Sequence, residues 1–160
     1  MSNKIRMNRN ESGSAIVEFA LVIGLFLSLL LMLIDLSILY WVNVNMQNAV
    51  REGVRYSITG QTNLSDPDDP NRYDAMIEKI RISSLGYYDK LTPDVDVFLV
   101  NNDGTVQTLP DRDLGGPGDL IVVRVNCTWP LITPFGRALF DNGEYNFSVS
   151  TTMRNEVFSE

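Results

Sequence analysis

The sequence predicts an α+β protein with one long N-terminal transmembrane helix. Three observations predict it: an apolar run near the N-terminus, a second amphipathic helical segment, and several segments in which apolar and polar residues alternate. We expect the long helix to continue into an exterior domain, where a second helix packs on an antiparallel sheet of about four strands. The expected parts are a cytoplasmic basic leader (1–13), a transmembrane helix (14–42), an amphipathic extension of that helix (43–60) and an exterior domain (61–160).

The apolar run extends from Ala15 to Ile34, and Glu18 is its single charged residue. Its 20 residues would form a helix about 30 Å long, which matches the hydrocarbon core of a bilayer. A buried core helix is one alternative, but a chain of 160 residues rarely buries a helix that is apolar on every side. A removable secretory signal is another. The segment from Asp35 to Trp41 contains no small-residue cleavage site, which favours a retained anchor.

Charge predicts the orientation of the chain. The sequence has 13 Lys and Arg against 20 Asp and Glu, and the leader holds Lys4, Arg6 and Arg9 against Glu11. Basic flanks of a membrane helix stay on the cytoplasmic side, so we expect the C-terminal domain outside. The acidic balance of that domain argues against nucleic acid as a partner.

Catalytic, metal-binding and cofactor motifs are missing from the sequence. It has no His and one cysteine, Cys127, which excludes the common zinc and Cys/His constellations. The glycine-rich segment from Gly115 to Gly118 does not open a helix, so we interpret it as a loop. We therefore expect no enzyme, cofactor, metal or small-molecule substrate, and we expect Cys127 to be a buried free thiol.

Glu18 needs a partner, because a carboxylate at the centre of a bilayer costs about 2.5–3.5 kcal/mol. It either reaches the inner headgroups or pairs with a new α-amino group. Cutting the chain after Gly13 would leave the amine of Ser14 about 6 Å from Glu18, one helical turn away.

Two segments resemble a known family. GSAIVEF, from Gly13 to Phe19, resembles the processing site of type IV prepilins, in which a basic leader ends in Gly and Glu stands at the fifth mature position. The short leader and the Glu18-Phe19 pair look most like the Tad (Flp) branch, and the chain length is similar to that of a TadE-like minor pilin or pseudopilin. A second segment, NAVREGVRY, resembles the one that follows the anchor in TadE-like proteins, and it contains Arg51, Glu52, Gly53 and Arg55.

The resemblance implies a non-enzymatic role in Tad pilus assembly and a pilin-like exterior domain. It implies cleavage between Gly13 and Ser14, with Glu18 and Phe19 recognised in processing and assembly and residues 51–55 packing the helix. The implied partners are the lipid bilayer, a prepilin peptidase, other Tad pilins and minor pilins, and the Tad assembly platform. The implied location is the bacterial inner membrane, with the C-terminal domain periplasmic or in a pilus used for adhesion or secretion. The alternative is an unprocessed single-pass protein with a periplasmic ligand-binding or sensory domain.

Beyond the membrane the helix is expected to reach about residue 58, with Gly60 ending it. Small and apolar residues recur there at spacings of three and four, and Gly53 is expected at a close packing contact. This face consists of Val42, Met46, Ala49, Val50, Gly53, Val54 and Ser57.

A polar linker, residues 61–70, precedes the second helix. Its three Asp residues could indicate calcium, but the rest of the EF-hand pattern is absent. We therefore interpret Asp69 as the N-cap of a helix that begins at Pro70 and runs to Leu85, where Gly86 ends it. Its inward face is expected to comprise Tyr73, Met76, Ile77, Ile80 and Ser84.

The remaining residues alternate as strands do. We expect strands at 95–99, 105–109, 120–129 and 144–154, with a hairpin turn at 102–104, a loop at 110–119 and a helical turn near 135–140. The clearest strand has an apolar face of Ile121, Val123, Val125, Cys127 and Trp129, and the last one has Tyr145, Phe147, Val149, Thr151 and Met153 on one face. From this alternation we expect residues 61–160 to be soluble alone.

Overall fold

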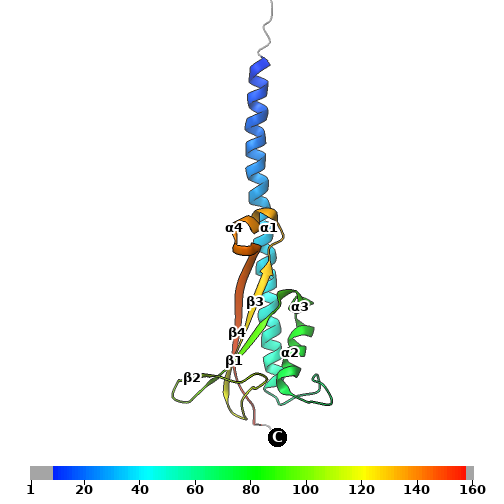
Figure 1. Ribbon diagram of the computed structural model, residues 1–160, viewed down its shortest axis with the longest axis vertical. Coiled ribbons are helices and arrows are strands. Elements are labelled where there is room, and N and C mark those ends of the chain that lie inside the picture. The colour runs from blue at the N-terminus through cyan, green and yellow to red at the C-terminus, as the bar shows by residue number, and fades with distance from the viewer. Residues whose placement is uncertain (1–8, 158–160) are drawn as a thin grey trace, which may run out of the picture.

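The fold is a four-stranded antiparallel sheet with one very long helix lying along it, and the helix extends far beyond the sheet at one end (Figure 1). The computed structural model describes the backbone of residues 9–157 and the side chains of residues 13–140 and 142–157. Most of the basic leader, residues 1–8, lies outside the described residues. The predicted α+β class, with a long N-terminal apolar helix and an antiparallel sheet, is confirmed. The helices are α1 (Arg9–Ser57), α2 (Arg72–Ser83), α3 (Tyr88–Leu91) and α4 (Pro134–Leu139), the strands are β1 (Asp94–Val100), β2 (Val106–Thr108), β3 (Leu120–Pro130) and β4 (Glu144–Arg154), and a 3₁₀ turn covers Asp141–Gly143.

The sheet has the strand order β2-β1-β3-β4, and each neighbouring pair is antiparallel. Val123 of β3 lies opposite Val97 of β1, and Val125 lies opposite Val149 of β4. These four valines are buried on one face of the sheet, together with Cys127. Because side chains alternate between faces, the apolar face predicted for residues 120–129 is the one that covers the core.

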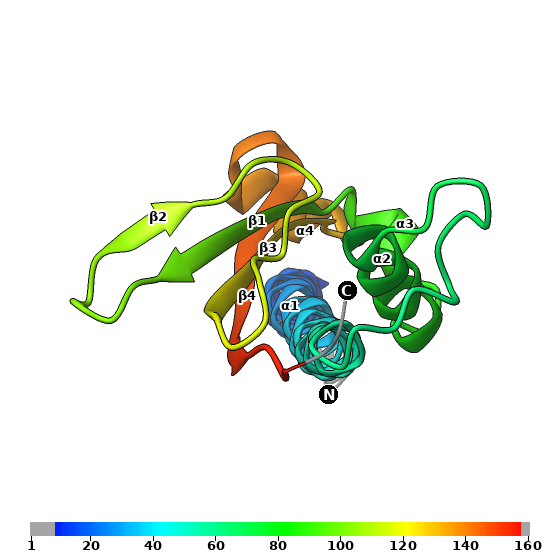
Figure 2. The ribbon, with the colours of Figure 1, turned by 90° about the horizontal axis from the view of Figure 1, so that it is seen from below.

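The second half of α1 lies on that apolar face, with α2 on its other side (Figure 2). All seven residues of the predicted face, from Val42 to Ser57, are buried. The core cluster joins this face of α1 to Met76 and Ile80 of α2 and to the inner residues of β3. The long helix is therefore part of the core of the C-terminal domain as well as the segment that projects from it.

The start of α2 differs from the prediction. The N-cap is Asn71, whose side chain accepts a hydrogen bond from the backbone N–H of Tyr73 at 2.7 Å, and the helix begins at Arg72. Asp69 does not cap it, and Pro70 is not its first residue, because the Asp69 carboxylate pairs with Arg112 from a distant loop.

The end of α2 also comes earlier than predicted. The helix ends at Ser83, and Leu85 and Gly86 both have positive φ, of 55° and 81°. This left-handed turn leads into α3, a single helical turn that the sequence did not predict. The turn lets Tyr87 pack edge-to-face on Trp129 of β3, with ring centroids 6.0 Å apart.

Candidate functional site: the exposed half of the long helix

The first half of α1 projects beyond the domain and exposes its apolar side chains (Figure 1). Gly13–Ser57 is long and apolar enough to cross a membrane, and its most apolar window has a mean hydropathy of 2.7 with none of it buried. The alternative of a buried core helix is therefore wrong for this segment. In water, exposed apolar surface costs about 25 cal/mol per Å², so this surface requires lipid or other apolar helices around it.

The predicted processing residues lie near the start of this exposed segment. Ser14 Oγ donates a hydrogen bond to Glu18 Oε1 at 3.1 Å, within one helical turn. The side chain of Phe19 is 68% exposed, and a Cβ added at Gly13 would meet no atom within 4 Å. Among the residues that the structure describes, no basic side chain forms an ion pair with Glu18. Within the described residues, the Glu18 carboxylate is thus bonded to the neighbouring Ser14 hydroxyl and to no basic group.

The residues of the second motif lie at the other end of α1, where they face in different directions. Gly53 points at α2, and a Cβ there would stand 2.3 Å from Ile80 Cγ1 and 3.0 Å from the Met76 carbonyl oxygen. Glu52 forms ion pairs with Arg55 at 3.3 Å and with Lys79 of α2 at 3.8 Å. Arg51 and Arg55 are exposed. Only part of this motif therefore joins α1 to α2.

Asp35 is a residue whose role the sequence did not reveal. It directly follows the apolar run, yet its side chain is only 4% exposed. Its carboxylate accepts hydrogen bonds from the backbone N–H groups of Ile132 and Thr133, each at 3.2–3.3 Å, and from the Thr133 hydroxyl. The Thr133 hydroxyl in turn accepts the N–H of Gly136 at 3.1 Å and caps α4. The one available signal was a lone carboxylate at the end of an apolar run.

Asn155 ties the end of the chain to the rest of the domain. Its side-chain amide donates to the carbonyl oxygens of Leu114 and Gly116 at 2.8 and 2.9 Å, and its backbone N–H donates to Asp119 O at 2.8 Å. The next residue, Glu156, donates its N–H to Ile58 O just after α1.

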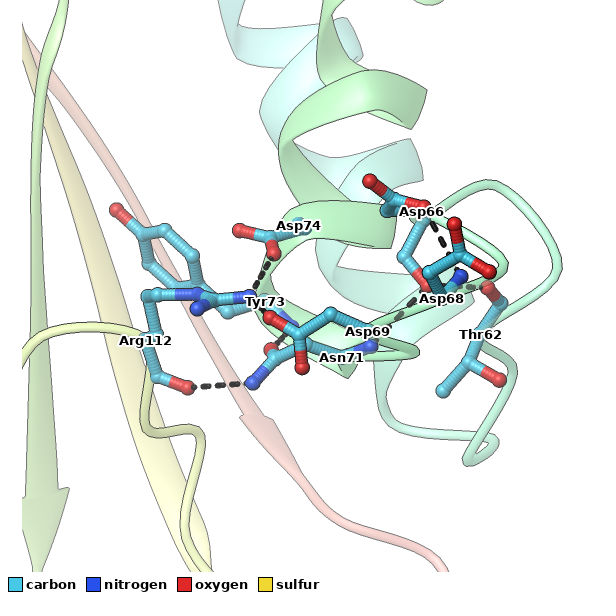
Figure 3. Close-up of polar contacts among 9 residues, drawn as sticks. Thr62, Asp66, Asp68, Asp69, Asn71, Tyr73, Asp74 and Arg112 are labelled. Carbon is cyan, nitrogen blue, oxygen red and sulfur yellow. Dashed lines mark hydrogen bonds and ion pairs between the residues drawn. The ribbon is translucent and has the colours of Figure 1, made fainter.

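One carboxylate of the acidic linker, that of Asp69, is paired with an arginine from a distant loop (Figure 3). Arg112 pairs with both Asp69 and Asp74, and these hydrogen bonds raise the pKa of its guanidinium. Asp66 accepts the N–H of Asp68 at 2.9 Å, as in an ordinary turn. Within the described part of the chain, no group of three or more His, Cys, Asp or Glu could hold a metal ion. These contacts therefore give no support for a calcium site in the linker.

Comparison with known proteins identifies the N-terminal segment. Residues 13–55 match the model of the family described as TadE-like protein. The predicted resemblance to that family is confirmed over these residues, which include the first motif and residues 48–55 of the second. No curated protein and no solved structure matches the chain.

Proposed function

From the TadE-like match of residues 13–55, we propose that this chain is a minor pilin or pseudopilin, a non-enzymatic component of Tad (Flp) pilus assembly. The observation that carries the proposal is the position of the match on the chain. The match begins at Gly13, the predicted processing site, two residues before the apolar run starts at Ala15. The match then covers the exposed apolar helix and much of the buried face that follows it.

In this proposal the chain is inserted with its N-terminus in the cytoplasm and its domain outside the bacterial inner membrane. A prepilin peptidase cuts between Gly13 and Ser14. The continuity of α1 from the apolar run into the core supports a retained anchor, because removing the run would cut through a helix that the domain packs around.

After cleavage, the exposed half of α1 packs with other Tad pilins and minor pilins on the Tad assembly platform. The new amine of Ser14 pairs with Glu18, on this chain or on a neighbour, which removes the cost of an unpaired carboxylate among apolar helices. The hydrogen bond between Ser14 and Glu18 supports this pairing, since it shows that the two residues are within reach of one another. The assembled pilus would serve adhesion or secretion.

The mass of the native protein, extracted from membranes that contain its own prepilin peptidase, tests the proposal. We expect a chain that lacks residues 1–13 and begins at Ser14. A chain that keeps Met1 to Gly13 would contradict the pilin proposal and favour an unprocessed single-pass protein with a binding or sensory domain. The same protein from cells without the peptidase is the control, and it should retain the leader.

A further inference from the structure

The segment around α4 lies at the end of the domain from which the exposed half of α1 projects (Figure 1). Three of its large apolar side chains are exposed. Ile132, Phe135 and Leu139 are 54%, 40% and 56% exposed. None of them belongs to the core cluster. The packing of the domain core therefore gives no reason for three large apolar side chains to lie at this surface.

Polar contacts fix this segment at one level of α1. Asp35 is the first residue after the 20-residue apolar run, and it binds the backbone of Ile132 and Thr133. Gly136 lies so close that a Cβ there would stand 2.5 Å from Asp35 Oδ2. The start of α4 is thus held at the point where the run ends.

The far end of α4 packs beside the same stretch of α1. Leu139 and Phe140 line a cavity of about 100 Å³ together with Met32, Leu36 and Leu39 of α1, which lie on both sides of Asp35. Phe140 also packs edge-to-face on Tyr145 at the start of β4, with ring centroids 5.8 Å apart. The helix α4 therefore lies around the level at which the apolar run ends.

We propose that α4 is a second membrane contact, in which Ile132, Phe135 and Leu139 insert into the outer boundary of the lipid bilayer beside α1. This inference rests on the membrane anchoring in the proposed function. A run of 20 residues spans about 30 Å, so its end coincides with the outer limit of the hydrocarbon core. Tyr40 and Trp41, exposed on the next turns of α1, are the aromatic types that gather at membrane interfaces.

The apolar surface of the α4 segment is continuous with the apolar half of α1, which favours lipid over a second copy of this chain as its partner. Leu33 and Leu36, on turns of α1 beside Asp35, are exposed as well, so α4 widens an apolar surface that the bilayer already meets. Arg137, exposed on the same short helix, adds a positive charge that anionic headgroups attract, and its Nε donates to the Leu131 carbonyl oxygen at 2.8 Å. Insertion needs no new ordering of the segment, because Asp35 and the Thr133 cap already hold it.

Lipid-depth quenching of a cysteine-linked fluorophore tests the inference on the full chain reconstituted in vesicles of phosphatidylethanolamine and phosphatidylglycerol. Phe135→Cys and Leu139→Cys carry the label, and Val106→Cys on β2, 63% exposed, is the matched control in the distal part of the domain. The wild-type chain is the blank, because its only cysteine is buried. With quenchers attached near the lipid headgroups, we expect quenching at 135 and 139 at least threefold greater than at 106.

Equal quenching at 135, 139 and 106 would overturn the inference. So would cross-linking between chains through the unlabelled Phe135→Cys and Leu139→Cys variants together with no lipid quenching of the labelled ones, since a second copy would then cover the segment. Leu25→Cys, in the middle of the apolar run, separates the two proposals. Quenching at 25 alone by quenchers deep in the acyl chains would reject only the role of α4, whereas no quenching at 25 would reject the anchor, and the α4 contact with it.

Discussion

Gly53 of α1 and Ile80 of α2 lie so close together that no larger residue fits at position 53 without a shift of one helix. A Cβ there would be 2.3 Å from Ile80 Cγ1 and also 3.0 Å from a backbone oxygen, which cannot rotate away as a side chain can. We therefore expect Gly53→Ala to lower the free energy of unfolding by about 1–3 kcal/mol, although alanine is the better helix former. Denaturant unfolding in detergent, followed by circular dichroism, measures this change.

Gly24→Ala is the matched control, because Gly24 lies in the same helix and a Cβ there would meet no atom within 4 Å. Its domain should unfold at the same denaturant concentration as the wild type. Equal stability of Gly53→Ala and wild type would mean that α2 moves aside at little cost.

Processing and assembly should respond to different residues. Gly13→Val places a branched side chain at the proposed cut, so we expect uncut precursor in the inner membrane. Glu18→Ala removes the partner of the new amine but keeps the apolar surface, so we expect normal cleavage and fewer surface pili. N-terminal sequencing of both variants, with a count of pili, makes the test. Normal cleavage of Gly13→Val would place the cut elsewhere, and undiminished piliation of Glu18→Ala would remove the pairing role.

The link between Asp35 and Thr133 should hold α4 in place. Asp35→Ala would leave the buried N–H and hydroxyl of Thr133 without an acceptor, at a cost of about 1–3 kcal/mol. Trypsin should then cut after Arg137 at least fivefold faster, since local opening becomes more frequent. Asp35→Asn keeps a carbonyl oxygen as acceptor and should fall between the alanine variant and the wild type. Identical cleavage rates in all three would show that α4 is held by other contacts.

The C-terminal domain should need the second half of α1 to fold. Val42, Met46, Val50 and Val54 are fully buried in its core. Burying each such side chain stabilises a protein by about 1.5–3 kcal/mol, and their sum is comparable to the 5–15 kcal/mol that holds a small domain together. We therefore revise the expectation drawn from the sequence: residues 61–160 alone should aggregate, and residues 35–160 should be soluble and unfold cooperatively. Gel filtration and thermal melts of the two fragments compare them.

Cys127 should make the domain less stable at alkaline pH. Burial raises the pKa of its thiol from 9.0 to about 11. The unfolded chain releases the proton first, so the folded state loses stability as pH rises from about 9 to 11 and loses nothing from this group below that window. Melting temperatures of wild type and Cys127→Ala across this range should converge as pH rises. Parallel curves would mean that the thiol has the same pKa in the folded and unfolded states. Any decline of the melting temperature common to both proteins would come from Tyr73 and Tyr88, whose pKa values burial also raises.

The elements with a repeating pattern were predictable from the sequence. The alternation in β3 and the three-and-four spacing from Val42 to Ser57 each identify a buried face, because the period of the backbone forces it. The N-cap of α2 was misplaced by two residues. Asn71 and Asp69 are both good capping residues, and only the ion pair of Asp69 with Arg112, 43 positions away, decides between them.

The polar contacts over long sequence distances were not predictable. Asp35 and Thr133 are 98 residues apart, and Asn155 binds a loop about 40 residues before it. No local pattern records such a pair, because each partner alone reads as a solvent-exposed residue. The proposed processing residues Gly13, Ser14 and Glu18 rest on the resemblance and on the cost of a carboxylate in an apolar run. Among the described contacts, that of Ser14 with Glu18 is local to the helix, so a periodic pattern of burial does not mark these residues.

Because α1 is a single helix without a hinge, the domain moves as a rigid body with the exposed half of that helix. No break separates the exposed half of α1 from the half that packs between the sheet and α2. From Asp35 to Ser57 the helix extends about 33 Å. In a bilayer, a helix tilt of about 20° would therefore carry the far end of the domain sideways by about 11 Å. The position and direction of the far end of the domain therefore depend directly on the tilt of α1. A force applied along α1 is transmitted to the core of the domain without a flexible joint between them.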